Sequence, residues 1–256
     1  MKLNELLDIV KKVQEAYNTS TPYICGGTPR DKYMKRLDNI DDLDFTTGDK
    51  TIKVVSVGLR DYLRNNYRIA YKQMDDGHSS IYMGNLKLDF SSNYMNPNID
   101  KELLSIGISN PTSLQKEMYS RDFTCNSLLL DLNLTTIFSP VNGAKKDIDN
   151  KIIKTCLPPE ITLMNSKNRV VRAIYLSSKL DFEIDVNIIN FVRAHPESLN
   201  VSVPDTVKSK LDKAFEYNPE KAVKNITAMN LWKYVPITDI MTPYYRKLIE
   251  VNKWAK

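Results

Sequence analysis

The residues of this chain best suited to chemistry are Asp42, Asp44 and Asp89. Residues 42–45 (Asp-Leu-Asp-Phe) alternate polar and apolar side chains, which predicts a strand that carries both carboxylates on one face. Asp89 ends a second strand-like segment and could complete the cluster. Carboxylate oxygens suit Mg²⁺, and a pair of such ions can bridge a nucleoside triphosphate and an attacking hydroxyl. The three acids therefore predict a magnesium site for phosphoryl transfer.

Two other interpretations of this Asp-x-Asp pattern need to be weighed. An Asp-x-Asp at the end of a strand is also typical of a solvated turn, so the motif by itself is weak. A calcium loop is a further alternative, but it requires Gly at its sixth position and Glu at its twelfth. Counted from Asp42, those positions hold Thr47 and Lys53, which excludes a calcium loop.

A glycine pair, Gly26-Gly27, follows a short buried strand expected at residues 23–25 and precedes a helix whose first position suits Pro29. Glycines at the start of a helix leave backbone N–H groups bare at its positive end, a geometry that suits a triphosphate. Arg30 could bind phosphate oxygens with its planar guanidinium. The alternative is an ordinary strand-to-helix turn, with Arg30 as a surface charge.

The elements that position these residues follow from the spacing of apolar side chains. Amphipathic helices are expected near both ends of the glycine and Asp-x-Asp region, and Gly84-Asn85 predicts a tight hairpin turn between two strands. The Asn-, Ser- and Pro-rich segment 93–111 lacks a clear period, which predicts a mobile loop. The expected helices are 3–17, 30–36 and 52–63, and the expected strands are 42–45, 80–83, 86–89, 127–131 and 135–138.

The pattern changes after Lys145, beyond which almost only helices are expected. This change predicts an α+β chain in two parts, joined near residues 150–160: a head of strands and helices at 1–150 and an all-helical part at 151–256. The helices expected in the second part are 161–180, 186–193, 206–215 and 219–229.

Composition sets broad limits on function. The chain has 256 residues, 42% of them hydrophobic, and its 36 Lys and Arg against 31 Asp and Glu leave a charge of +5, compatible with a polyanionic partner. Three scattered cysteines predict neither a disulfide framework nor a zinc site and favour a reducing cytoplasm. The chain starts as an amphipathic helix, unlike a signal peptide, and no apolar run approaches the ~20 residues of a membrane span.

Five motifs, taken in order, resemble those of the class II tRNA nucleotidyltransferases and bacterial poly(A) polymerases. The resemblance covers the chain from about residue 20 to about residue 230, and the shared order and spacing outweigh the weakness of each motif alone. The motifs are Gly-Gly-Thr-Pro-Arg-Asp at 26–31, Asp-Leu-Asp at 42–44, Leu-Asp-Phe at 88–90, Arg-Asp-Phe-Thr-Cys-Asn-Ser-Leu at 121–128 and Arg-Val-Val-Arg-Ala at 169–173.

The resemblance implies a nucleotidyltransferase head with a mixed or antiparallel sheet at 1–150, followed by a helical neck and truncated body at 151–256. It also implies a role for each matching residue. Asp42 and Asp44 would hold Mg²⁺, and Asp89 would be the third catalytic and metal-binding position, at the RNA 3′-hydroxyl. The nucleotide-binding set would be Gly26, Gly27, Arg30 and Asp31 at the triphosphate, Arg121, Asp122 and Asn126 at the ribose, and Arg169 and Arg172 facing the incoming base.

The chain departs from the family pattern where the family selects the base. A Glu-Asp pair usually precedes the arginine at position 169, and its Asp reads cytosine or adenine together with that arginine. Here the corresponding residues are Asn165 and Ser166, which offer hydrogen-bond donors as well as acceptors, whereas a carboxylate only accepts. The choice between CTP and ATP is therefore left open by the sequence. A tyrosine, Tyr175, also stands where an arginine is common.

The leading hypothesis is a magnesium-dependent, template-independent enzyme that adds nucleotides to an RNA 3′ end. Addition of CCA or part of it to tRNA from CTP and ATP comes first, poly(A) synthesis second and an altered base choice third. A competing hypothesis is an RNA-binding module that keeps the fold and has lost catalysis. Three clustered acids disfavour such a module, because their mutual repulsion is costly without a cation. A small-molecule nucleotidyltransferase would leave the helical neck motifs unexplained.

Overall fold

The computed structural model describes residues 1–37, 40–166, 168–196 and 204–254. The chain forms two compact units, Met1–Lys146 and Asp147–Lys256, and each is described by itself. The first unit holds a mixed sheet, and the second is built mainly of helices.

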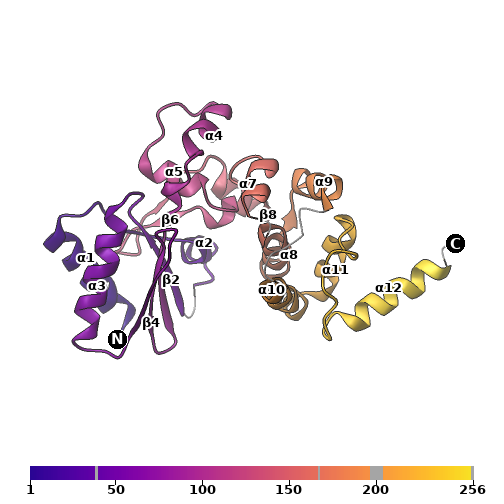
Figure 1. Ribbon diagram of the computed structural model, residues 1–256, viewed down its shortest axis with the longest axis horizontal. Helices are drawn as coiled ribbons and strands as arrows, with labels where there is room; N and C mark the ends of the chain where they lie inside the picture. Colours follow the sequence, from indigo (N-terminus) through magenta and orange to yellow (C-terminus); the bar gives the residue numbers. More distant parts are fainter. Residues whose placement is uncertain (38–39, 167, 197–203, 255–256) are drawn as a thin grey trace. The chain divides into compact units, whose positions relative to one another are not determined.

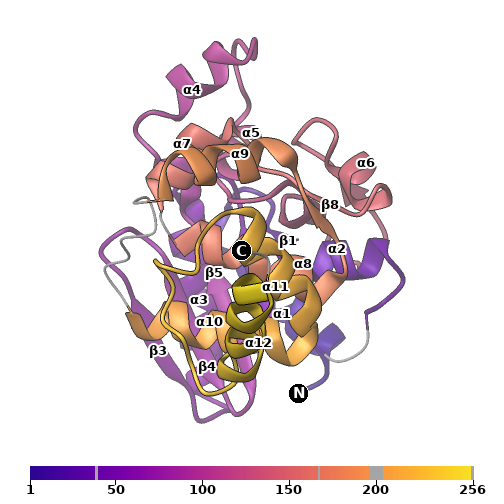
Figure 2. The same ribbon diagram turned by 90° about the vertical axis from the view of Figure 1, so that its right-hand side faces the viewer.

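Among the described residues, the sheet of the first unit has seven strands in the order β3-β4-β5-β2-β1-β6-β7. Neighbouring strands run antiparallel, except that β2 and β5 pair in parallel. Figure 2 shows β3 and β4 at one edge of the sheet. The strands are β1 (Tyr23–Cys25), β2 (Asp42–Thr46), β3 (Ala70–Gln73), β4 (Ser79–Met83), β5 (Leu86–Phe90), β6 (Leu129–Leu130) and β7 (Ile137–Phe138).

One face of the sheet is apolar because every second side chain of its central strands points to the same side. Leu43 and Phe45 of β2 are fully buried, as is Leu88 of β5, and the Phe45 and Phe90 rings stack at 5.7 Å. Helices α1 (Leu3–Tyr17) and α3 (Thr51–Arg64) lie side by side over this face and complete the core (Figure 1). The opposite face is left for the polar residues of the same strands.

The first unit also contains shorter helical segments between and after its strands. Helix α2 begins at Gly27, two residues before the expected Pro29, and ends at Tyr33 instead of Arg36. These segments are α2 (Gly27–Tyr33), the 3-10 turn η1 (Asn93–Met95), α4 (Ile99–Ser105), α5 (Ser113–Tyr119), the 3-10 turn η2 (Thr124–Asn126) and α6 (Ala144–Asp149), which spans the boundary between the units.

The expectation of a mobile loop at 93–111 is wrong. This segment contains η1 and α4, and it is anchored because Ile99 and Leu103 bury their side chains on one side of α4. Two apolar residues in so short a helix give little periodic signal in the sequence. The strand expected at 127–131 is reduced to Leu129–Leu130, because residues Thr124–Asn126 form a 3-10 turn just before it.

The described part of the second unit is mainly helical. It also contains a short parallel strand pair that the sequence did not predict, β8 (Ile152–Ile153) and β9 (Glu183–Ile184). Helix α8 packs against α10 and α11. The single helix expected at 161–180 is two helices, α7 and α8, separated around position 167, which lies outside the described residues. The helices are α7 (Pro159–Asn165), α8 (Asn168–Leu180), α9 (Val186–Ala194), α10 (Pro204–Tyr217), α11 (Pro219–Ala228) and α12 (Thr242–Trp254).

The architecture confirms the predicted α+β class, with a mixed sheet and helices followed by a helical part. None of the described helices combines the length and the apolarity needed to cross a bilayer.

Candidate active site

Pairing of two strands in parallel brings together aspartates that are far apart in the sequence. In the register of β2 and β5, Asp44 is the Cα partner of Asp89, and Asp42 is the partner of Lys87. Side chains of paired residues point to the same face of a sheet. All four therefore lie on the face opposite the apolar core, where the sequence predicted an acid cluster.

The Gly26 turn fits closely around Asp44. Gly26 has φ +77° and ψ −135°, a conformation that side chains rarely tolerate. A Cβ atom at this position would lie 1.9 Å from the Asp44 Oδ2 atom, which is shorter than any contact between non-bonded atoms. The first glycine of the pair is therefore required both by the backbone and by the carboxylate beside it.

The electrostatic environment of Asp44 disfavours its charge. Burial, together with repulsion from Asp42 and Asp89, raises the pKa of Asp44 from 3.8 to about 6, although Arg121 and Lys87 lower it. A carboxylate in such surroundings gains from a nearby cation. This is the electrostatic condition that a metal site provides.

The Asp89 carboxylate has partners on both of its oxygen atoms. Ser80 Oγ on β4 donates a hydrogen bond of 2.5 Å to Oδ1, and Lys87 Nζ forms an ion pair with Oδ2. Burial lowers the pKa of Lys87, but the hydrogen bond and the charge of Asp89 outweigh it, so the pKa is raised. Lys87 and Ser80 are two residues of the site that the sequence reasoning missed. The signal for Lys87 was its spacing, since it lies two residues before Asp89 on the same strand face.

The three acids fit a divalent cation in chemistry and in strand register, because each is a hard oxygen donor on one sheet face. Their side chains are not gathered around a common point, and among the described residues no three His, Cys, Asp or Glu side chains form a ready metal site. Both oxygens of Asp89 are engaged, by Ser80 and by Lys87. The assignment of the metal to Asp42, Asp44 and Asp89 stays a prediction.

A buried polar cluster ties the glycine turn to the 3-10 turn η2. Arg30 is only 3% exposed, and its guanidinium donates to both carboxylate oxygens of Asp31, at 2.8 and 2.9 Å, and to Asn126 Oδ1. The family resemblance implied a nucleotide-binding role for all three residues. In the structure they are held together, and Arg30 braces α2 against η2. Their role at the triphosphate stays a prediction.

Arg121 approaches the acids from the side of α5. Its Nη2 atom donates a hydrogen bond to Cys25 Sγ at 2.8 Å and lies 3.8 Å from Glu117 Oε1. Burial lowers the pKa of Arg121, but the neighbouring acidic groups, Asp44 and Glu117 among them, raise it overall. Arg121 is thus a fixed positive charge next to Asp44. The adjacent Asp122 accepts a hydrogen bond of 2.9 Å from the backbone N–H of Phe123 and so shapes the start of η2.

Glu117 is a further residue that the sequence did not single out. Its side chain is fully buried and accepts hydrogen bonds from Ser91 Oγ at 2.6 Å, from Asn93 Nδ2 at 3.2 Å and from the Tyr94 backbone N–H at 2.8 Å. It thereby joins α5 to the end of β5 and to η1. The signal for it was its position near the end of α5, four residues before Arg121, which follows that helix.

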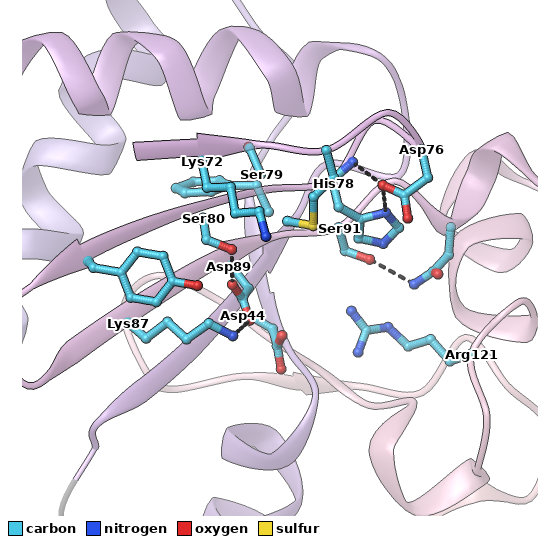
Figure 3. A pocket seen from close by; sticks show the side chains of 14 residues that line it. Asp44, Lys72, Asp76, His78, Ser79, Ser80, Lys87, Asp89, Ser91 and Arg121 are labelled. Carbon is cyan, nitrogen blue, oxygen red and sulfur yellow. Dashed lines mark hydrogen bonds and ion pairs between the residues drawn. The ribbon is translucent and has the colours of Figure 1, made fainter. Parts of the chain in front are cut away.

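Asp44, Asp89 and Arg121 line a cavity of about 370 Å³ at the polar face of the sheet. Figure 3 shows Lys87 and Arg121 approaching Asp44 from opposite sides, with Asp89 and Ser80 above it and Lys72 extending from β3. Acidic and basic side chains therefore face a common space that is open to a polar ligand. Its lining includes Asp44, Lys72, Asp76, His78, Lys87, Asp89 and Arg121.

The remaining predicted residues belong to the second unit. Arg169 and Arg172 are half-buried on α8, and Arg169 Nη1 donates a hydrogen bond of 3.0 Å to the carbonyl oxygen of Thr162 on α7. Asn165 is the last residue of α7 and is exposed, and Ser166 caps that helix. Arg169 therefore fixes α7 against α8, and the proposed role of both arginines toward a base stays a prediction.

Residues 22–154 match the family model described as the poly(A) polymerase head domain. The chain is 26% identical over 145 residues to a CCA-adding enzyme of Limosilactobacillus reuteri, an alignment that covers 56% of this chain and 35% of the relative. It is 25% identical over 248 residues to a CCA-adding enzyme of Staphylococcus epidermidis, covering 89% of this chain and 54% of the relative. The chain thus spans about half or less of the length of these relatives.

A solved structure has the same fold at low sequence identity. The CCA-adding enzyme of Bacillus stearothermophilus in complex with CTP superposes with a TM-score of 0.66 and 19% identity, covering 92% of this chain and 55% of that structure. The similarity extends beyond the matched head segment into the helical unit.

Proposed function

Because the chain belongs to the poly(A) polymerase head-domain family, we propose that it is a magnesium-dependent enzyme that adds nucleotides to the 3′ end of an RNA without a template. The observation that supports this most is the register of β2 and β5, which sets Asp44 beside Asp89 on the open face of the sheet. At Gly26 the lack of a side chain leaves room for the Asp44 carboxylate. A purely structural sheet has no need of such an arrangement.

In this mechanism Asp42, Asp44 and Asp89 would hold divalent cations. When bound, such cations lower the pKa of a ribose hydroxyl and neutralise the charge of a pyrophosphate leaving group. Arg121 keeps a fixed positive charge beside Asp44 and thereby favours the ionised carboxylate that can bind a metal. Arg30, Asp31 and Asn126 hold the glycine turn in place. The protein would contribute positioning and charge, and none of these side chains need act as a nucleophile.

The proposed acceptor is a tRNA, since the relatives that align over most of this chain are CCA-adding enzymes. The base to be added is a separate question. Asn165 and Ser166 stand where the family usually has a Glu-Asp pair, and Ser166 lies at the helix end beside α8. This substitution is the reason to keep an altered or relaxed choice between CTP and ATP as a further candidate. Poly(A) synthesis is the corresponding outcome if ATP alone is used repeatedly.

The test is an extension assay with tRNA lacking its 3′ end, Mg²⁺ and each labelled triphosphate in turn. We expect extension with at least one of CTP and ATP, and we expect it to be lost in Asp42→Ala and Asp44→Ala. Product length and composition separate CCA addition from poly(A) synthesis. Absence of extension with all four triphosphates, together with tight tRNA binding, would instead identify an RNA-binding module that has lost catalysis.

A further inference from the structure

The ion pair between Lys87 and Asp89 lies at the predicted metal site. Both residues face the cavity on the polar side of the sheet, and Lys87 is also the strand partner of Asp42. Ser80 donates a hydrogen bond to one oxygen of the Asp89 carboxylate, and Lys87 forms the ion pair with the other. A lysine ammonium thus lies where the proposed mechanism requires a divalent cation to bind.

The two positive charges that act on Asp44 differ in their freedom to move. The Arg121 side chain is 11% exposed and is bound to Cys25, close to Glu117. The Lys87 side chain is 38% exposed and ends a flexible four-carbon stem. Lys87 can therefore leave the carboxylate without opening the core, whereas Arg121 cannot.

We propose that Lys87 is an internal counter-cation, which neutralises Asp89 in the metal-free protein and which a divalent ion must displace in order to bind. This inference rests on the proposed metal-dependent function. It explains why the three acids are in register but not gathered around a point, since Asp89 is held by the lysine. It also implies that Lys87 weakens metal binding while it stabilises the metal-free state.

The consequence for binding follows from competition between two cations for one carboxylate. Removing the competing ammonium leaves the acids with more uncompensated charge and gives the metal an unoccupied partner. The same removal increases repulsion among Asp42, Asp44 and Asp89 when no metal is present. One substitution should therefore tighten metal binding and destabilise the metal-free protein.

The experiment measures Mn²⁺ binding to the full chain without nucleotide, by the electron paramagnetic resonance signal of free Mn²⁺. We expect Lys87→Met to lower the Mn²⁺ dissociation constant by about tenfold, a change typical of one strong charge contact near a protein surface. Lys72→Met is the matched control, because Lys72 lines the same cavity and is exposed. It should change the constant by less than about threefold, the effect of a more distant charge. Lys87→Arg, which keeps the positive charge, should bind Mn²⁺ more weakly than Lys87→Met.

A second readout is thermal unfolding in a chelator and in saturating Mn²⁺. Lys87→Met should melt below the wild type in the chelator and gain more than the wild type from Mn²⁺. The role of Lys87 would be overturned if Lys87→Met bound Mn²⁺ no more tightly than the wild type, or no more tightly than Lys72→Met. The proposed function would remain intact in that case. Mn²⁺ binding that is absent from the wild type, or is unaffected by Asp44→Asn, would overturn the metal site itself and the proposed function with it.

Discussion

At the residue scale, the site depends on the close contact between Gly26 and Asp44. Gly26 combines a positive φ with a carboxylate oxygen of Asp44 where a Cβ atom would lie, so two separate effects exclude a side chain there. Asp44 lies under that turn with a pKa raised to about 6 by burial and by the neighbouring acids. The turn and the aspartate are therefore coupled, and a change in either should alter the other.

Gly26→Ala should destabilise the protein and remove activity. The backbone strain costs about 1–3 kcal/mol, and displacement of Asp44 by the new methyl group adds to it. Gly84→Ala is the matched control: Gly84 also has positive φ, but a Cβ there meets nothing within 4 Å, so only about 1 kcal/mol of strain is expected. Urea unfolding measures the loss in the free energy of unfolding for both variants. Equal losses in the two variants would contradict the proposed clash with Asp44.

Asp44→Asn should stabilise the metal-free protein at neutral pH. The folded-state pKa of about 6 lies above the ordinary value of 3.8, so the folded protein binds more protons between these values, and the cost of ionising Asp44 is complete above pH 6. We expect a gain of about 1–3 kcal/mol at pH 7.5 that disappears as the pH falls below about 4. Denaturant unfolding across this range in a chelator measures the gain.

The control for that experiment is Asp41→Asn, at the exposed residue just before β2. It should change stability by less than about 0.5 kcal/mol, as is usual for surface substitutions. A pH-independent gain in Asp44→Asn, or the same gain in Asp41→Asn, would show that burial of the Asp44 charge is not its cause.

At the element scale, the site is assembled by polar connections between short segments. Helix α5 is held to the end of β5 and to η1 through Glu117, and α2 is held to η2 through Arg30 and Asn126. Short helices gain little from their own hydrogen bonds, so tertiary contacts must fix them. These buried polar bridges determine where Arg121 and the glycine turn lie relative to the strands.

Glu117→Ala should therefore have a large effect for a residue outside the acid cluster. It removes the acceptor of three hydrogen bonds from a fully buried site, and a loss of about 2–4 kcal/mol is expected. Glu102→Ala on α4 is the control, because Glu102 is half-buried and accepts one bond from Asn96, and it should cost less than about 1 kcal/mol. Chemical unfolding compares the free energies of unfolding of the two variants. Similar losses would mean that the Glu117 bridge contributes little.

At the scale of the whole molecule, the segment that matches the family model and the first compact unit end at different residues. The matched family segment ends at residue 154, whereas the first compact unit ends at Lys146. The difference is explained by β8, which lies within the matched segment but pairs with β9 of the second unit. The hydrophobic core under the sheet is formed by residues between Leu3 and Ile137, all within the first unit.

A fragment of residues 1–150 should consequently fold by itself, with a cooperative thermal transition followed by circular dichroism. It keeps the entire sheet, the core and α6. A fragment of residues 1–128 should not fold, because it lacks β6, whose Leu130 pairs with the interior strand β1 and is fully buried. Cooperative unfolding of the shorter fragment, or its absence in the longer one, would contradict this division.

The sequence by itself determined the local features of the site. Alternation at 42–45, the Gly84-Asn85 turn and the glycine pair each predicted a local conformation that the structure has, because such features depend on residues that are neighbours in the chain. The order of the motifs also predicted the family, and the change from strands and helices to helices alone predicted the α+β class. Weakly periodic segments such as α4 were missed, because their conformation is decided by burial.

Only the tertiary structure decided how the charged groups are partnered. That Asp89 is held by Lys87 and Ser80, that Glu117 is buried beneath Arg121, and that Arg30 braces a turn all depend on segments brought together by folding. The chemistry of an ionisable group depends on its desolvation and on the charges around it, and neither is encoded in spacing along the chain. The acids could be named from the sequence, but the cation that already neutralises one of them could not.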